Sequence, residues 1–171
     1  MNKFSGRQAM AIRRLNHAVL YVRDTERSVA FYTQVLGFRV VQQGPGAAFL
    51  RAPESDNDHD LGLFQVGEQA GPSGAGNTTV GLYHLAWSVR TLTDLAEHAV
   101  KLREAGALVG ASDHVTTKAL YAKDPDGIEF EVSWLVPLDR VTEQMRAAAG
   151  THPLDIEAEI RHWGPELVGA L

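Results

Sequence analysis

The sequence contains no cysteine, and this absence excludes several kinds of chemistry. Disulfides, cysteine nucleophiles, thiolate zinc sites and cysteine-ligated iron–sulfur clusters all require a thiol. Any metal ion that this protein binds must therefore be held by nitrogen and oxygen ligands.

Long apolar runs and an excess of positive charge are also missing. No stretch approaches the ~18 apolar residues of a membrane-spanning helix, and residues 1–14 contain no apolar segment typical of a signal peptide. The formal net charge of −5 offers no basic surface for nucleic acid. We therefore expect one cytoplasmic domain of 171 residues, without nucleic-acid or membrane partners.

The chain contains an internal repeat. A segment rich in β-forming residues begins at Leu15 and includes His17, and a similar segment begins at Leu82 and includes His84 at the equivalent position. Both segments end before a polar break, which predicts a strand in each. Because the match extends to a histidine, we interpret it as two copies of one structural unit.

A helix pattern follows each of these strands. Asp24 or Thr25 can cap the first helix and Thr91 or Thr93 the second, and a glycine lies where each helix is expected to end. Three shorter β-like stretches come next in each half of the sequence. They cover residues 38–43, 47–51 and 61–66 in the first half, and residues 108–112, 117–122 and 128–135 in the second.

Each half therefore reads β-α-β-β-β, which predicts an α+β fold. The first module covers residues 12–66, a Gly- and Ser-rich linker 67–81, the second module 82–136 and a helical tail 137–171. Within the tail, residues 139–149 and 153–163 have helical patterns, with Pro153 suited to a first helical turn. We interpret the tail as a packing or dimer-contact appendage, with a lid over the site as the alternative.

Three residues could hold a metal ion. If the two halves are related by a pseudo-twofold axis, His17 and His84 project from equivalent strands toward a common cavity. On the last strand Glu131 faces away from the apolar Phe130 and Val132. Two histidines and a carboxylate form a facial triad, which is typical of non-haem iron(II) oxygenases. The alternative for Glu131 is a solvated residue on an exposed strand.

These motifs resemble those of the vicinal oxygen chelate family, which includes glyoxalases, bleomycin resistance proteins and extradiol dioxygenases. The resemblance rests on four segments, namely Asn-His-Ala-Val at 16–19, Phe-Tyr-Thr-Gln-Val-Leu-Gly-Phe at 31–38, Tyr-His-Leu-Ala at 83–86 and Asp-Pro-Asp-Gly at 124–127. It spans residues 12–136 and implies two βαβββ modules that form a cupped mixed sheet around one metal ion. The implied ligands are His17, His84 and Glu131.

Within this family the sequence is most similar to single-domain extradiol dioxygenases of the catechol 2,3 type. Residues 58–64, which include His59, resemble the strand that bears their acid–base histidine, and His114 and Tyr121 resemble residues that bind the substrate oxygen. The resemblance implies Fe(II), or Mn(II) on the same ligands, with an aromatic diol and dioxygen as substrates, and a homodimer or higher oligomer. His59 would act first as a base and then as an acid. Each of these three side chains could instead be structural or solvated.

Three alternatives use the same fold. A glyoxalase-like isomerase needs a second carboxylate from the first module, and Asp60 lies too early in its strand to supply one. A fosfomycin-type antibiotic-resistance enzyme also uses two histidines and a glutamate, but the His59, His114 and Tyr121 set is not its signature. A metal-free binding protein of the bleomycin-sequestering kind lacks the three metal ligands.

Overall fold

The computed structural model describes residues 11–74, 78–148 and 150–170. Residues 1–10, which carry most of the segment where we expected no signal peptide, lie outside this description. No helix in the described ranges has the length and apolar character needed to cross a membrane. In chain order the elements are β1 (Ala18–Val22), α1 (Thr25–Gln34), β2 (Arg39–Gly44), β3 (Ala47–Arg51), β4 (Leu61–Gln65), β5 (Leu85–Ser88), α2 (Leu92–Glu104), β6 (Leu108–Asp113), β7 (Thr117–Lys123), β8 (Glu129–Leu135), α3 (Glu143–Ala147), β9 (His152–Pro153) and α4 (Ile156–Trp163).

The strands form two sheets of the same topology. The first sheet has the order β1-β4-β3-β2 and the second β5-β8-β7-β6-β9. In each sheet the first strand of the module is parallel to the last, and the other pairs are antiparallel. This arrangement confirms the α+β class with two βαβββ units and a C-terminal helix.

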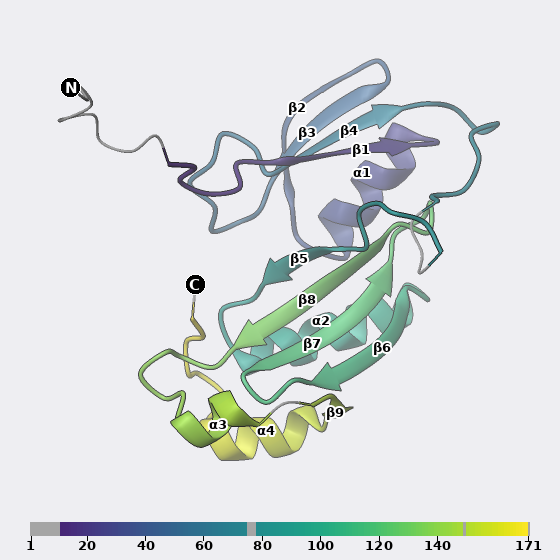
Figure 1. The fold of residues 1–171 in the computed structure, drawn as a ribbon. Helices are drawn as coiled ribbons and strands as arrows, with labels where there is room; N and C mark the ends of the chain where they lie inside the picture. The colour runs from purple at the N-terminus through teal and green to yellow at the C-terminus, as the bar shows by residue number, and fades with distance from the viewer. Residues whose placement is uncertain (1–10, 75–77, 149, 171) are drawn as a thin grey trace, which may run out of the picture.

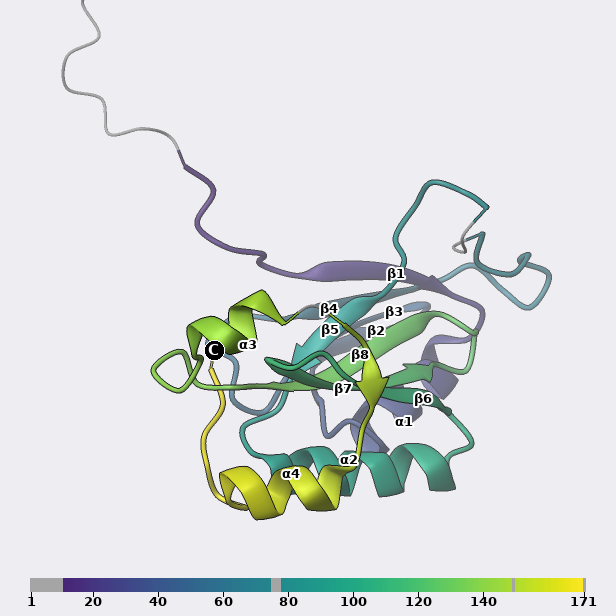
Figure 2. The same ribbon diagram turned by 60° about the horizontal axis from the view of Figure 1, so that its bottom comes forward.

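Both sheets turn their uncovered faces to the same side of the molecule. In Figure 1, α1 and α2 lie behind the strands, and after the rotation in Figure 2 these two helices lie on the lower side of the sheets. The strands β1 and β5 are the edge strands that face the other module, and they are not joined into one sheet. The strands of the two modules therefore form two separate sheets, one in each module.

The predicted capping signals are present in the structure. Asp24, not Thr25, caps α1 by accepting a hydrogen bond from the backbone of Arg27. Thr91 caps α2 in a reciprocal capping box with Asp94. Such caps satisfy the backbone N–H groups that a helix leaves unpaired at its start.

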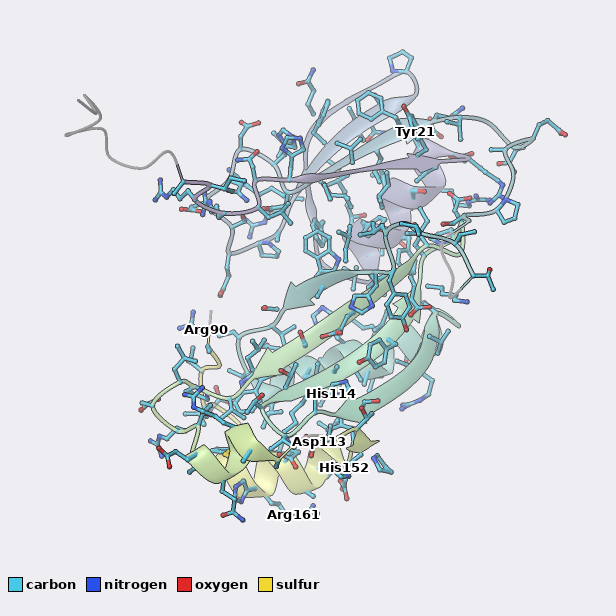
Figure 3. The ribbon with its side chains drawn as sticks, in the orientation of Figure 1. Tyr21, Arg90, Asp113, His114, His152 and Arg161 are labelled. Atoms are coloured by element: carbon cyan, nitrogen blue, oxygen red, sulfur yellow. The ribbon has the colours of Figure 1, made fainter. Side chains whose placement is uncertain are left out.

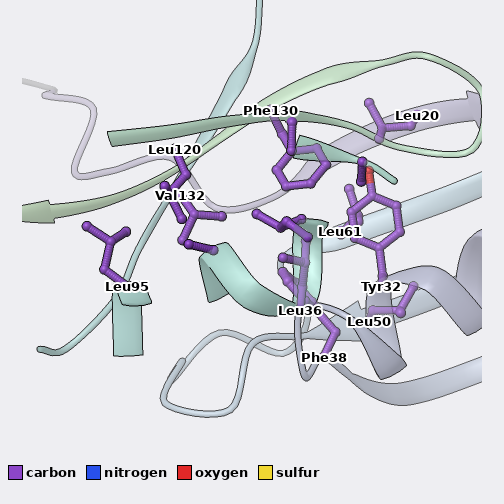
Figure 4. Packing of buried hydrophobic residues seen from close by; sticks show 14 of the residues in the cluster. Leu20, Tyr32, Leu36, Phe38, Leu50, Leu61, Leu95, Leu120, Phe130 and Val132 are labelled. Carbon is purple, nitrogen blue, oxygen red and sulfur yellow. The ribbon is translucent and has the colours of Figure 1, made fainter. Parts of the chain in front are cut away.

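The core follows from alternation along the strands. In β1, Leu20 and Val22 are buried, whereas Val19 and Tyr21 are 50% and 74% exposed. The two modules share this core, because Tyr32 of α1 packs against Phe130 of β8 with ring centroids 6.4 Å apart (Figure 4).

The Asp-Pro-Asp-Gly turn before β8 connects the two modules. The Asp124 carboxylate accepts hydrogen bonds from the backbone N–H groups of Asp126 and Ile128, both at 2.9 Å, which closes the turn. The carboxylate of Asp126, only 5% exposed, forms ion pairs with Arg23 at 2.9 Å and Arg27 at 2.7 Å. The turn that leads into β8 is therefore anchored to the start of the first module's helix.

The tail differs from the prediction. The first expected helix is shorter, and Ala149 at its expected end lies outside the described residues. Pro153 is not in a first helical turn but in β9, which pairs with β6, and Asp155 caps α4 instead. Proline is tolerated there because β9 is an edge strand, where a missing N–H costs no ladder bond.

Candidate metal centre

His84 and Glu131 lie together at one edge of the second sheet. Because β5 is parallel to β8 and Ala86 pairs with Glu131, the residue just before β5 lies beside the carboxylate. The distance from His84 Nε2 to Glu131 Oε2 is 3.4 Å. Two ligand atoms that each lie about 2.0–2.2 Å from one ion are separated by roughly 3 Å. The spacing of this pair therefore fits two ligands of one divalent metal ion.

The bonding of His84 is incomplete. Its Nδ1 is buried and has no hydrogen-bond partner among the described residues. A buried polar atom without a partner costs free energy. The described residues of the second module therefore do not supply a hydrogen-bond partner for Nδ1 of this histidine.

Tyr121 and His114 extend the site along β7. Tyr121 pairs with Glu131 in the sheet register, and its ring lies 6.1 Å from that of His84. Its hydroxyl is 2.7 Å from His114 Nε2. Burial, together with the negative charge of Glu131, raises the pKa of Tyr121, so the phenol keeps its proton near neutral pH.

His17 and His59 form a second group on the first sheet. Their ring centroids are 4.5 Å apart, and His59 also contacts Phe49 at 5.0 Å. The Nδ1 of His17 lies 2.7 Å from Asn16 Oδ1, and the Nδ1 of His59 lies 3.0 Å from the Asp58 carboxylate. Since these oxygens can only accept, Nδ1 carries the proton and Nε2 is unprotonated in each neutral ring. His17 can then bind a metal through Nε2, and His59 can accept a proton.

The Asp60 carboxylate is committed to its own loop. It accepts hydrogen bonds from the Ala52 N–H at 2.8 Å, the Ser55 hydroxyl at 2.7 Å and the Asn57 amide at 2.6 Å. These bonds engage both carboxylate oxygens, which supports the interpretation that Asp60 is not a metal ligand.

The six expected site residues thus fall into two half-sites. The first half-site is His17 with His59, and the second is His84, Glu131, Tyr121 and His114. Across residues 11–74, 78–148 and 150–170, no group of three or more histidine, aspartate and glutamate side chains is placed to hold a metal ion. Two cavities of about 510 and 440 Å³ lie between the modules, and their linings do not include the three expected ligands. The expected convergence within one chain is therefore not observed, because the ligands lie on two unjoined sheets.

Two further residues were missed by the sequence reasoning. Asn16 orients His17; it belongs to the Asn-His-Ala-Val segment, but the sequence assigned it no role. Thr151 of the tail lies 3.2 Å from His114 Nδ1; a tail over the site was the alternative interpretation, but nothing in the sequence singles out Thr151.

The chain matches a family model over residues 14–132, that of the Glyoxalase/Bleomycin resistance protein/Dioxygenase superfamily. It is 33% identical over 140 residues to biphenyl-2,3-diol 1,2-dioxygenase 3 of Rhodococcus globerulus, covering 77% of this chain and 70% of that protein. It is also 33% identical over 118 residues to catechol-2,3-dioxygenase of Bacillus subtilis, covering 69% of this chain but only 40% of that longer protein.

Solved structures share the fold. A glyoxylase/bleomycin resistance protein/dioxygenase domain from Frankia superimposes with a TM-score of 0.61 at 26% identity, over 72% of this chain and 92% of that one. The fosfomycin resistance protein FosX of Listeria monocytogenes has a TM-score of 0.56 at 14% identity, over 80% of this chain and 99% of its own. The second likeness shows the fold alone.

Proposed function

The chain belongs to the Glyoxalase/Bleomycin resistance protein/Dioxygenase superfamily, and on this basis we propose that it is a metal-dependent extradiol dioxygenase that opens the ring of a catechol-like diol. The observation that carries the proposal is the second half-site, where His84 and Glu131 have metal-ligand spacing and the His114–Tyr121 pair adjoins them. The 33% identity to two diol dioxygenases supports the same reaction class.

The proposed site needs a second copy of the chain. His84 and Glu131 supply two ligands, and His17 of another copy would supply the third. Both sheets expose their uncovered faces on one side (Figure 1). We propose that a second copy docks on this side, with the first half-site of each chain against the second half-site of the other. The exposed Val19, Tyr21 and Tyr83, at 50%, 74% and 65%, support contact with another surface. We therefore propose a homodimer with two such sites.

The proposed metal is Fe(II), with Mn(II) as the alternative on the same ligands. When bound, it supplies the Lewis-acid and redox chemistry that joins an aromatic diol to dioxygen. The protein's own residues bind and orient the diol and move its protons. Nε2 of His59 would take a proton from a diol hydroxyl and later return it, while Tyr121 and His114 would hydrogen-bond to the other oxygen.

The experiment compares His59→Phe with His98→Phe in protein loaded with Fe(II). Loss of a general acid–base group typically slows turnover about 10²- to 10⁴-fold, so His59→Phe should retain metal and bind diol without oxygen but turn over slowly. The Nδ1–H of His98 donates to the Asp94 backbone carbonyl within α2, so replacement of His98 should leave turnover unchanged. Ring opening is followed by the appearance of the yellow product in a panel of substituted catechols.

A glyoxalase-like isomerase or a fosfomycin-type resistance enzyme is the competing proposal. The fold is shared with FosX, but Asp60 is bonded within its loop and does not offer the extra carboxylate of the isomerase. The same metal-loaded protein should be assayed with thiol adducts of methylglyoxal and with fosfomycin. Turnover of either compound, with no oxygen consumed with any diol, would overturn the dioxygenase proposal.

A further inference from the structure

The loop that presents His114 is strained. Val115 has a backbone φ of 68°, in the left-handed region that β-branched residues rarely adopt. Hydrogen bonds hold it there: the Val115 N–H donates to Asp113 Oδ1 at 2.7 Å, and the His114 N–H donates to the Thr117 carbonyl at 2.8 Å. Strain of this kind persists only where the surroundings enforce it, and it concentrates at functional sites.

Both ring nitrogens of His114 face a hydroxyl group. Nε2 lies 2.7 Å from the Tyr121 hydroxyl and Nδ1 lies 3.2 Å from the Thr151 hydroxyl. A hydroxyl can donate or accept, so both contacts can form with either neutral tautomer, and together they hold the ring between the Thr151 and Tyr121 side chains. Thr151 therefore acts on the end of the ring opposite to the one that meets Tyr121.

The tail backbone is fixed next to this contact. His152, which follows Thr151, pairs with Asp113 in the β9–β6 ladder, and Figure 3 shows Asp113, His114 and His152 gathered where the tail meets the sheet. The buried amino group of Lys118 binds Asp113 at 2.6 Å and Glu159 of α4 at 3.1 Å. The hydroxyl of Thr151 is thus carried by a segment that is attached to the second module directly after this residue.

We propose that Thr151 is a positioning residue, through which the C-terminal tail fixes the orientation of the His114 ring and so holds the Tyr121 hydroxyl in the second half-site. The contribution of this residue to turnover rests on the proposed dioxygenase function. Its effect on the His114 ring does not, because the contact is made between two side chains of the protein itself.

The first test is made on metal-free, ¹⁵N-labelled protein. Long-range ¹H–¹⁵N NMR correlations report the tautomer of each histidine ring, and a His114→Gln variant assigns the signals. The ¹H and ¹⁵N shifts of the His114 ring should agree between the wild type and Thr151→Ser, and should change in Thr151→Val and Thr151→Ala, where the hydroxyl contact is lost. The matched control is Thr93→Val, because the Thr93 hydroxyl also ties the tail to the body by donating to the Pro165 carbonyl but does not touch His114.

The second test measures turnover of a substituted catechol by the Fe(II)-loaded protein. Losing one neutral hydrogen bond that orients a side chain should lower kcat about threefold to tenfold in Thr151→Val, with KM changed by less than about twofold, and Thr151→Ser should restore kcat. An unchanged His114 spectrum in both Thr151→Val and Thr151→Ala would overturn the positioning role. A changed spectrum in a protein that opens no diol ring would support it and reject the dioxygenase function instead.

Discussion

The two proposed histidine ligands differ in how their rings are held. His17 donates Nδ1–H to the Asn16 side chain at 2.7 Å, which leaves Nε2 for the metal. Nδ1 of His84 is buried without a partner among the described residues. A metal-binding histidine usually has its second nitrogen hydrogen-bonded, because that bond fixes the ring and raises its basicity. His17 is therefore prepared for metal binding in the isolated chain, and His84 is not.

Replacing Asn16 should weaken metal binding without unfolding the protein. Loss of such an orienting partner typically costs about 10- to 100-fold in metal affinity, so we expect a weakening in that range for Asn16→Ala. Competition with a chelator, using Mn(II) to avoid oxidation, measures the affinity. Asn16→Asp retains the acceptor oxygen and should bind nearly as well as the wild type; equal affinities for Asn16→Ala and wild type would contradict the role of Asn16.

The side of the strand on which each candidate lies could be predicted from alternation alone. Glu131 was expected opposite Phe130 and Val132, and in β8 those two apolar residues are buried while Glu131 is part-exposed. The partners of the histidine rings could not be predicted in the same way. Thr151 reaches His114 across 37 positions of the chain, and no local pattern encodes a contact of that length.

At the scale of elements, one buried lysine attaches the tail to the second module. The amino group of Lys118 is 4% exposed and pairs with Asp113 of β6 and Glu159 of α4. Glu159 also accepts a hydrogen bond from the Trp163 indole at 3.0 Å. Three elements thus meet at one cation.

Lys118→Met should loosen α4 selectively. Removing one member of a buried ion pair leaves the other charges uncompensated, which typically costs about 3 kcal/mol or more. We expect a loss of that order in the free energy of unfolding, measured in urea, and faster hydrogen exchange in residues 156–163. Lys101→Met, on the exposed face of α2, is the control. Unchanged exchange in α4 would show that other contacts hold the tail.

The elements of the modules were easier to predict than those of the tail. Caps and glycines mark the ends of α1 and α2, because both signals act within a few residues. In the tail, Pro153 is compatible with a first helical turn and with an edge strand. In the structure it pairs with Ser112 and is therefore part of a strand. That pairing depends on where β6 lies in space, which the local sequence does not specify.

At the scale of the whole molecule, the anchored turn at Asp126 holds the two modules, and with them the two half-sites, in fixed positions relative to each other. Its ion pairs to Arg23 and Arg27 cross from the second module to the first. The repeat in the sequence predicted the two modules, but it could not distinguish ligands that meet within a chain from ligands that meet between chains. A pseudo-twofold axis within the chain and a twofold axis between chains both pair equivalent strands.

Mixing two inactive variants distinguishes these arrangements. His17→Ala and Glu131→Ala should each lose the metal as homodimers, but a mixed dimer has one site with all three ligands intact. With random pairing we expect about a quarter of the wild-type metal content and activity to return. His84→Ala mixed with Glu131→Ala is the control, because both changes affect ligands from the same module and no mixed dimer has an intact site. If the first mixture recovers nothing, the ligands do not come from two chains.

The outer edges of the two sheets are protected in different ways. An open strand edge is a template on which other chains can add, and this can lead to aggregation. All six residues of β2 are exposed at one such edge, but Arg39 and the irregular register between Val40 and Gln42 disfavour a flat pairing surface. At the opposite edge, β9 covers the end of β6. The segment that carries Thr151 into contact with His114 therefore also shields this end of the protein from uncontrolled polymerisation.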